Sequence, residues 1–388
     1  MALTNFAKLT EEQKTIWSMD LWKQAREQSF LNKFLGKGPN SLVQHITELK
    51  KSEKGTRAVI TLVADLEGDG VVGDRLLEGN EEAIKSYDQV IQIDQIRHGH
   101  RSEGRIAEQK SIVDFRKTAR DVLAYWLADR IDQLAFQTLG GVSYALKPDG
   151  TARTDSQFSQ LEFAAANTAP SNKRVGSWTS TNGLTVGAGA TSTYTGGFTQ
   201  KNSLPCWDLF LELKKYARET YMRGVRNGGE ETFHAFLTPE AMMLLKQDPV
   251  FRENLRHAQT RGDQNDLFTG NSVKIDGVVL HEFLHVPHAS TGYGGLQQAD
   301  DYNATPAGYT HKGSQILFCG AQALAYADIG APSWDEEKFD YSNQCGIATA
   351  KIAGFLRPKF KNQYVNDVAP QDFGVINVHV CHDKTAAV

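Results

Sequence analysis

The sequence predicts a mixed α+β fold for this chain of 388 residues. Three observations support that class. A long helical pattern covers residues 111 to 139, two strand patterns flank a glycine-rich acidic stretch between residues 57 and 96, and helix and strand patterns alternate after residue 204. The hydrophobic content of 40% and the charged content of 23% are ordinary for a globular protein.

The first 35 residues read as largely helical. Apolar residues recur from Ile16 to Leu35, and the sequence Gly-Lys-Gly-Pro at 36–39 ends the pattern. Because exposed clusters of aromatic side chains usually mark contact sites, Trp17, Trp22 and Phe34 are candidate contacts with another subunit. The alternative is an N-terminal helix docked on its own domain.

The next segment reads as two strands joined by a long exposed loop. Residues 58–63 are a β-branched run, residues 87–96 alternate in polarity, and Asp65 to Glu82 between them are rich in glycine and acidic residues. Loops of this length are usually functional. The sequence Gly-Asp-Gly at 68–70 lacks the spacing of a calcium loop, so no metal is expected there.

Charge is distributed unevenly over these first two segments. Residues 1–57 carry ten Lys and Arg against six Asp and Glu, whereas residues 58–100 carry three against nine. Net charges of +4 and −6 in neighbouring segments favour pairing, within one chain or between copies. The acidic candidates for contacts between subunits are Asp65, Glu67, Asp69 and Asp74.

The long helix is predicted from Ser111 to Leu139. Apolar residues fall there at steps of three and four, Ser111 with Asp114 resembles a helix cap, and Gly140-Gly141 supplies a C-terminal stop. A helix of this length spans about 40 Å.

The remainder of the chain divides by composition. Residues 148–203 are dominated by Ser, Thr, Gly, Ala and Asn, which predicts a surface excursion or partly ordered insertion with room for two short paired strands. Alternating helices and strands predict an α/β subdomain at about 204–310. Strands follow at 315–319, at 347–360 with a break at Pro358, and at 375–381.

Two groups of side chains in the sequence contain potential metal ligands. His281-Glu282-Phe283-Leu284-His285 matches the zinc-protease motif, but it follows a strand pattern and is stopped by Pro287, and two histidines four strand residues apart are separated by about 13 Å. A zinc hydrolase using His281, Glu282 and His285 is therefore a disfavoured alternative. His379, Cys381 and His382 are interpreted as a structural thiol and surface imidazoles.

Other motifs argue against catalysis and membrane insertion. The sequence has no phosphate-binding loop, no Gly-x-Ser-x-Gly and no apolar run of 18 residues. Its N-terminus lacks the pattern of a signal peptide, and four widely spaced cysteines suit buried free thiols. We expect no enzymatic activity, no cofactor and no bound metal.

Three segments resemble a known family. Residues 9–14 (LTEEQK), 61–70 (TLVADLEGDG) and 121–130 (DVLAYWLADR) are similar to major capsid proteins of N4-like tailed bacteriophages. The resemblance implies the Hong Kong 97-type shell fold. It divides the chain into an N-terminal arm (1–55), an E-loop (56–101), a peripheral domain with the spine helix (102–147), an insertion (148–203), an axial domain (204–311) and a return to the peripheral domain with a C-terminal strand (312–388).

The resemblance also implies a function and partners. The chain would self-assemble, as hexamers and pentamers, into an icosahedral shell around the double-stranded DNA of a tailed phage, after synthesis in the cytoplasm of a bacterial host. A portal is expected as a partner. A separate scaffolding protein is also expected, because the E-loop begins within 60 residues of Met1 and a scaffolding domain fused ahead of the arm is therefore not expected. DNA contacts would be non-specific, since the net charge is −4 and no basic stripe is present. An encapsulin-like shell that stores cargo is the alternative, and packaged DNA would discriminate.

Overall fold

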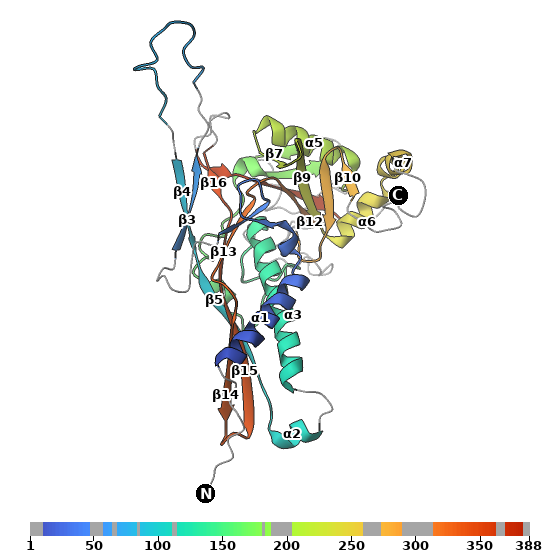
Figure 1. Ribbon diagram of the computed structural model, residues 1–388. Coiled ribbons are helices and arrows are strands. Elements are labelled where there is room, and N and C mark those ends of the chain that lie inside the picture. The colour runs from blue at the N-terminus through green and yellow to red at the C-terminus, as the bar shows by residue number, and fades with distance from the viewer. Residues whose placement is uncertain are drawn as a thin grey trace.

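The computed structural model describes residues 11–46, 57–63, 68–83, 86–110, 115–180, 183–187, 204–258, 273–288, 313–361 and 369–382. Figure 1 shows an elongated molecule with three parts: a lower part in which helices lie beside a sheet, an upper lobe of mixed helices and strands, and a hairpin that projects beyond both. The mixed α+β class predicted from the sequence is confirmed.

The lower part is built on a six-stranded sheet. Its order is β1-β2-β13-β15-β14, and β5 pairs with β15 on the remaining side. The strands are β1 (Leu35–Gly36), β2 (Val43–Ile46), β5 (Asp94–Arg101), β13 (Leu324–Asp328), β14 (Ser333–Phe339) and β15 (Gln344–Leu356). Strands from both ends of the chain therefore meet in one sheet.

The long predicted helix is present as α3 (Phe115–Gly140), and the predicted start at residues 111–114 lies outside the described residues. It ends as the Gly140-Gly141 pair predicts. Gly141 has a φ of +67°, the Gly141 N–H donates to Thr138 O at 3.2 Å, and the Val142 N–H donates to Gln137 O at 2.9 Å. These two bonds form a Schellman motif, which satisfies carbonyls at the helix end.

The N-terminal segment crosses this helix. It contains α1 (Glu11–Gln28) and the short 3-10 helix η1 (Leu31–Phe34). The buried carboxylate of Asp132 on α3 accepts hydrogen bonds from Ser29 Oγ (2.7 Å), from the Phe30 N–H (2.8 Å) and from the Leu31 N–H (3.2 Å). The junction between α1 and η1 is thus attached to the body of the same chain.

Replacing Asp132 by alanine is expected to release this junction. The Phe30 and Leu31 N–H groups would lose their acceptor, which should cost about 2–4 kcal/mol in the free energy of unfolding. Urea unfolding would measure the loss, and limited proteolysis should show faster cleavage near residue 30. Asp132→Asn keeps one acceptor and should lose less, and Asp121→Ala, at a half-exposed position on the same helix, should change stability by under about 0.5 kcal/mol. Equal losses in all three variants would contradict this account.

The upper lobe holds an eight-stranded sheet of order β10-β11-β9-β12-β18-β6-β7, with β8 paired to β9. Its strands are β6 (Val175–Thr179), β7 (Gly183–Val186), β8 (Val225–Asn227), β9 (Glu230–Leu237), β10 (Val273–Ile275), β11 (Val278–Glu282), β12 (Gly313–Cys319) and β18 (Val375–Cys381). The helices of the described chain besides α1 and α3 are α2 (Arg105–Lys110), α5 (Trp207–Glu219), α6 (Pro239–Gln247) and α7 (Pro249–Ala258), with 3-10 turns η2 (Phe158–Gln160) and η3 (Asn172–Arg174).

Two parts of the upper lobe differ from the sequence-based expectations. Strands β12 and β18 lie in this sheet, although residues 312–388 were expected to return to the peripheral domain; every residue of both strands is buried, as befits central strands. Within 148–203, the expected strand pair is present as β6 and β7. The expectation of a surface excursion was wrong for part of this stretch, because Phe163, Val175 and Trp178 are buried.

The projecting hairpin consists of β3 (Arg57–Val63) and β4 (Ser86–Gln92), which pair antiparallel over their full length. The sequence pattern at 87–96 predicts one strand, but the chain passes Ile93 and continues as β5 in the sheet of the lower part. The projection therefore ends at about Gln92. The smallest pairing, β16 (Lys359–Phe360) with β17 (Gln371–Asp372), lies near its base.

Candidate functional site

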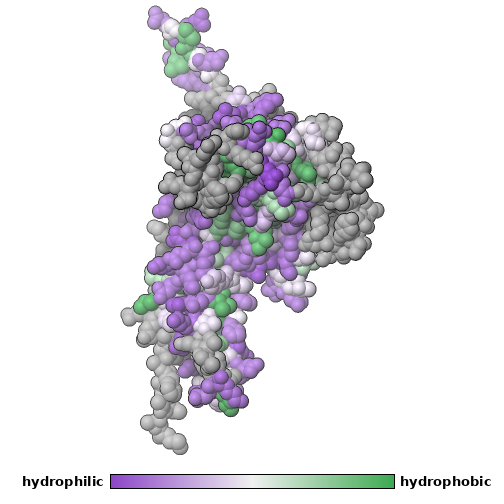
Figure 2. Space-filling view, turned by 90° about the vertical axis from the view of Figure 1, so that its right-hand side faces the viewer, coloured by the Kyte–Doolittle hydropathy of each residue, from purple (hydrophilic) through white to green (hydrophobic). Residues whose placement is uncertain are grey.

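The most exposed apolar side chains of the hairpin lie at its tip. Val72, Leu76 and Leu77 are 76%, 75% and 58% exposed. Figure 2 shows hydrophobic residues at the tip surrounded by hydrophilic ones. A projection that ends in exposed leucines is typical of a surface that contacts another protein.

Two of the four predicted acidic contact residues lie in the described part of the hairpin loop. Asp69 and Asp74 are exposed, whereas Asp65 and Glu67 lie outside the described residues. The tip has local order: the Gly68 N–H donates to Glu82 Oε2 at 2.7 Å, and the Asn80 N–H donates to Leu77 O at 2.9 Å. The arrangement offers acidic and apolar groups together, which suits binding to a protein and provides no catalytic geometry.

The base of the hairpin is fixed to the body by packing and by one side chain. Ala58, Ile60 and Ile91 are buried against Ala325 and Leu356 of the lower sheet. Gln89 on β4 bonds the backbone of Lys359 twice: its Oε1 accepts from the Lys359 N–H at 3.0 Å and its Nε2 donates to the Lys359 carbonyl. These contacts set the direction of the projection.

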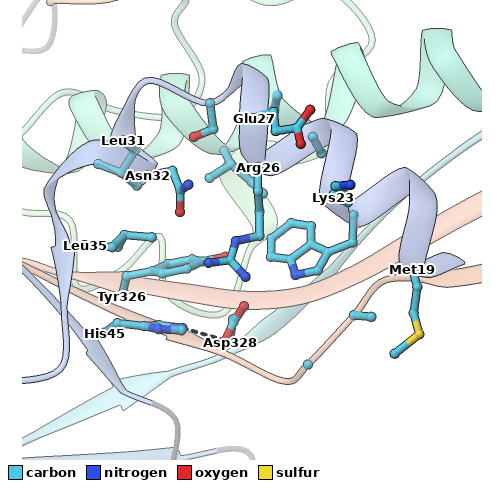
Figure 3. A pocket seen from close by; sticks show the side chains of 17 residues that line it. Met19, Lys23, Arg26, Glu27, Leu31, Asn32, Leu35, His45, Tyr326 and Asp328 are labelled. Atoms are coloured by element: carbon cyan, nitrogen blue, oxygen red, sulfur yellow. Dashed lines mark hydrogen bonds and ion pairs between the residues drawn. The ribbon is translucent and has the colours of Figure 1, made fainter.

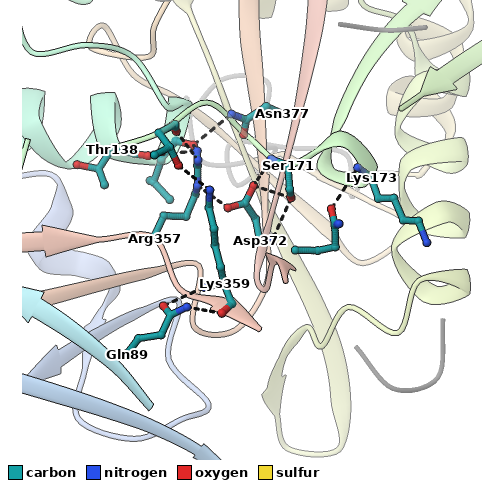
Figure 4. A network of polar contacts seen from close by, with 11 residues as sticks. Gln89, Thr138, Ser171, Lys173, Arg357, Lys359, Asp372 and Asn377 are labelled. Atoms are coloured by element: carbon teal, nitrogen blue, oxygen red, sulfur yellow. Dashed lines mark hydrogen bonds and ion pairs between the residues drawn. The ribbon is translucent and has the colours of Figure 1, made fainter. Parts of the chain in front are cut away.

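Lys359 belongs to a polar network around Arg357 (Figure 4). Arg357 Nε donates to Asp372 Oδ1 at 2.7 Å, and its terminal nitrogens donate to Leu139 O (3.2 Å) and Thr168 O (2.6 Å). Asp372 Oδ2 accepts from Ser171 N–H at 2.7 Å. Arg357 and Asp372 are 4% and 0% exposed. The buried ion pair thus joins the end of α3, the 168–171 loop and the strand pair beneath the hairpin.

The predicted aromatic contacts of the N-terminal segment pack on their own chain. The Trp17 ring lies 5.6 Å from that of Trp334, Lys351 Nζ lies 4.0 Å above the Trp22 ring, and Phe34 packs edge-on against Phe236 at 5.1 Å. All three are half-buried. This position matches the alternative of a helix docked on its own domain, and their contact with another subunit stays a prediction.

A groove of about 840 Å³ runs between α1 and the lower sheet (Figure 3). Trp22, Leu31, Leu35 and Tyr326 give it apolar walls. One of its two carboxylates, Asp328, bonds His45 Nε2 and Lys351 Nζ, each at 2.8 Å. Burial alone would raise the pKa of Asp328, but the bond from His45 and the charge of Lys351 hold that pKa below its ordinary value. These groups stabilise one another beneath α1.

The His-Glu-x-x-His motif lies on a strand and its exit, as predicted from its flanks. His281 Nε2 lies 2.9 Å from His234 Nδ1, and His285 Nε2 lies 2.6 Å from Asp129 Oδ1. The two imidazoles therefore have different partners on different elements. Among the described residues, no three His, Cys, Asp or Glu side chains are grouped as a metal site.

The stability of the chain is expected to fall in mild acid. The pKa of His281 is lowered to about 4, chiefly by burial and further by the charges of His234 and Lys33. Burial also lowers the pKa of His234 and of His379. The unfolded chain keeps ordinary values near 6.5, so it binds more protons as the pH falls below that value. Stability is thus greatest above pH 6.5 and declines toward about pH 4.

Urea unfolding of His281→Gln measures this contribution. The variant should lose less stability than the parent chain between pH 7 and pH 4.5, because it no longer carries a buried imidazole that the unfolded state protonates. His98→Gln, which removes an exposed imidazole stacked on Trp126, is the matched control and should follow the parent. A parent-like slope for His281→Gln would contradict the assignment.

Ser314, His382 and Glu240 are connected in the order known from serine hydrolases. His382 Nε2 lies 2.6 Å from Ser314 Oγ, and His382 Nδ1 lies 3.0 Å from Glu240 Oε2. Ser314 is fully buried in β12, and Thr238 Oγ1 donates to its hydroxyl at 3.1 Å. A substrate cannot reach such a hydroxyl. The three groups instead attach the end of β18 to the start of α6.

The histidines near the C-terminus correct one expectation. His379 and His382 are 0% and 5% exposed, so the interpretation as surface imidazoles was wrong. Their strand is central in the upper sheet and is covered on both faces. The four cysteines are free, and Cys319 and Cys381 are buried, as predicted.

Sequence reasoning missed the residues that now look most important. Val72, Leu76 and Leu77 stand in the acidic stretch as short apolar pairs, and only their position at the end of a projection gives them meaning. Arg357 and Asp372 are 15 residues apart and carry no motif. The pairs of apolar residues inside a long polar loop were the feature of the sequence that could have indicated a contact site at the hairpin tip.

Comparison with known proteins gives consistent results. A family model described as phage capsid protein matches residues 5–383. The chain is 52% identical, over 378 residues and 97% of both chains, to the major capsid protein of Pseudomonas phage KPP25.

Solved structures share the fold. The capsid of Ralstonia phage GP4 matches with a TM-score of 0.71 and 23% identity over 93% of each chain. The capsid asymmetric unit of cyanophage Pam1 matches with a TM-score of 0.66 and 18% identity, covering 98% of this chain and 100% of that one. None of the helices in the described part of the chain has the length and hydropathy needed to cross a membrane.

Proposed function

This chain belongs to the phage capsid protein family and is the shell-forming major capsid subunit of a phage. We propose that its shell is icosahedral and of the Hong Kong 97 type. We further propose that the shell encloses the double-stranded DNA of an N4-like tailed phage. The observation that carries the proposal is the 52% identity, over 97% of both chains, to the major capsid protein of Pseudomonas phage KPP25.

In this proposal each part of the chain has a shell role. Residues 1–55 act as the N-terminal arm, residues 56–101 form the E-loop, and α3 is the spine helix of a peripheral domain at 102–147. Residues 148–203 are an insertion and residues 204–311 are the axial domain. Residues 312–388 return to the peripheral domain and end in the C-terminal strand. Support comes from the projecting hairpin and the 26-residue helix.

The contacts between subunits would combine apolar and charged groups. Exposed ion pairs are worth about 0–1 kcal/mol each, whereas burying a leucine side chain contributes about 1.5–3 kcal/mol. The exposed tip residues Val72, Leu76 and Leu77, together with Asp69 and Asp74, are therefore the main candidates. Shells held in this way would be only partly sensitive to salt.

The remaining partners follow from the same proposal. Hexamers and pentamers of this chain would form the shell, with a portal and a separate scaffolding protein. Packaged DNA would be contacted without sequence preference, and the subunits would be made in the bacterial cytoplasm before they enter the virion.

Electron microscopy of the expressed chain tests the proposal. We expect closed shells, with scaffolding protein supplied where the phage encodes one, and nuclease-resistant double-stranded DNA in particles purified from infected cells. Particles that contain a cargo enzyme and no DNA would contradict the genome-holding role. A protein that stays monomeric under all assembly conditions would contradict shell formation.

A further inference from the structure

The groove of about 840 Å³ beneath α1 is walled by segments from distant parts of the chain (Figure 3). Its apolar lining comes from α1, η1, β1, α3 and β13, and it consists chiefly of Trp22, Leu31, Leu35, Ile131 and Tyr326. Sites for small molecules typically measure about 300–1,000 Å³ and have mostly apolar walls with a few polar groups. The groove therefore has the size and the lining of a site for a small organic molecule.

Positive charge at this groove has no ion-pair partner in the described part of the chain. Lys23 and Arg26 lie one turn apart on α1, and both side chains are exposed. In Figure 3 Arg26 descends from the helix toward Tyr326, whereas the Glu27 carboxylate points away from Arg26. A ligand that enters beside Arg26 therefore meets an unpaired cation.

The carboxylate at the floor of the groove is already paired. Asp328 bonds His45 Nε2 and Lys351 Nζ, each at 2.8 Å, and the side chain of Lys351 is fully buried. The ammonium group of Lys351 balances the charge of Asp328. The floor therefore offers no free carboxylate to a cationic ligand, and the charge that remains to be met is that of Arg26 and Lys23.

The hydroxyl of Tyr326 supplies a second donor at the same point. Tyr326 is 2% exposed, and its hydroxyl lies near the Asp328 carboxylate without forming a hydrogen bond to any described residue. Burial raises the pKa of Tyr326 well above its usual value, so the hydroxyl keeps its proton. Figure 3 shows the ring of Tyr326 reaching beneath the guanidinium of Arg26. Two donors thus converge where the apolar walls meet.

We propose that this groove binds the anion of a long-chain carboxylic acid, with the carboxylate held by Arg26 and Tyr326 and the alkyl chain held by the apolar walls. A guanidinium and a hydroxyl are suitable donors to a carboxylate, and the alkyl chain gains by leaving water. The bound molecule contacts α1, η1 and the sheet together, so it fastens the N-terminal segment to the body. This inference does not depend on the shell function.

Calorimetric titration of the full-length chain with dodecanoate, below its micelle concentration, tests the binding. We expect one dodecanoate per chain and a thermal unfolding midpoint that rises with dodecanoate concentration, because the ligand binds the folded state. Dodecyltrimethylammonium, which has the same alkyl chain and the opposite charge, should bind at least tenfold more weakly. Equal binding of the two amphiphiles, or many dodecanoates per chain without saturation, would overturn the proposal.

Substitutions test the two donors. Arg26→Gln should lower the affinity for dodecanoate at least tenfold, Arg26→Lys should keep most of it, and Tyr326→Phe should lower it severalfold while retaining the ring. The matched control is Arg218→Gln, which removes an exposed cation from α5 in the upper lobe and should bind like the parent chain. Circular dichroism checks that each variant is folded. Parent-like affinity in both Arg26→Gln and Tyr326→Phe would contradict the assignment.

Tryptophan fluorescence tests the location. Dodecanoate that occupies the groove lies against Trp22, so it should change the emission of the parent chain, and Trp22→Phe should remove most of that change. Trp207→Phe, at a half-buried position in the upper lobe, should retain it. If the change persists in Trp22→Phe, the molecule binds elsewhere and the proposed site is wrong.

Discussion

Replacing Arg357 by methionine is expected to lower the free energy of unfolding by about 3–5 kcal/mol, because it leaves the carboxylate of Asp372 buried without its cation. Asp372 is fully buried, and Arg357 also donates to carbonyls at the end of α3 and in the 168–171 loop. The loss should appear in urea unfolding, with fewer intact shells as a consequence.

Two further variants separate charge from packing in this network. Adding Asp372→Asn to Arg357→Met removes the uncompensated charge while keeping an acceptor for Ser171, so it should recover part of the lost stability. Lys359→Met is the matched control, because this cation is half-buried and bonds Thr168 Oγ1 near the surface. A loss below about 1 kcal/mol in Arg357→Met would show that the ion pair does not hold these elements together.

Changing Leu76 and Leu77 to aspartate is expected to abolish shell formation without unfolding the subunit. Both side chains are exposed in the isolated chain, so the thermal unfolding midpoint should hardly change. In a shell each tip would lose the burial of two leucines, about 3–6 kcal/mol, which corresponds to more than a hundredfold in association.

Size-exclusion chromatography and electron microscopy would measure this effect. Leu284→Asp provides the control, because that leucine is 69% exposed and lies outside the hairpin. The control should assemble normally. If the tip variant forms normal shells, the leucines of the hairpin tip do not make the contacts that assembly requires.

The elements with strong local patterns could be predicted from sequence. The long helix with its glycine stop, the strand at 58–63 and most of the strand at 87–96 follow from periodicity and turn residues. Each depends on contacts between residues close in sequence.

The features that could not be predicted from the sequence depend on pairing between residues far apart in the chain. Strand β6 adds to β18 across about 200 residues, so the composition of 148–203 gave no sign that Trp178 is buried. Trp17 and Trp22 were assigned by their hydrophobicity alone, which indicates burial but does not identify the partner. Asp132 anchors the junction between α1 and η1 on α3, and an acidic residue outside the apolar stripe of a helix gives no sign of such a contact in the sequence.

The most direct test of the central claim is a near-atomic map of the assembled shell. The account predicts that Val72, Leu76 and Leu77 of each subunit are buried against a neighbouring copy, with α1 still crossing α3 of its own chain. A map in which the tips stand free in solvent, and the subunits are held together by N-terminal helices that have left their own bodies, would contradict it.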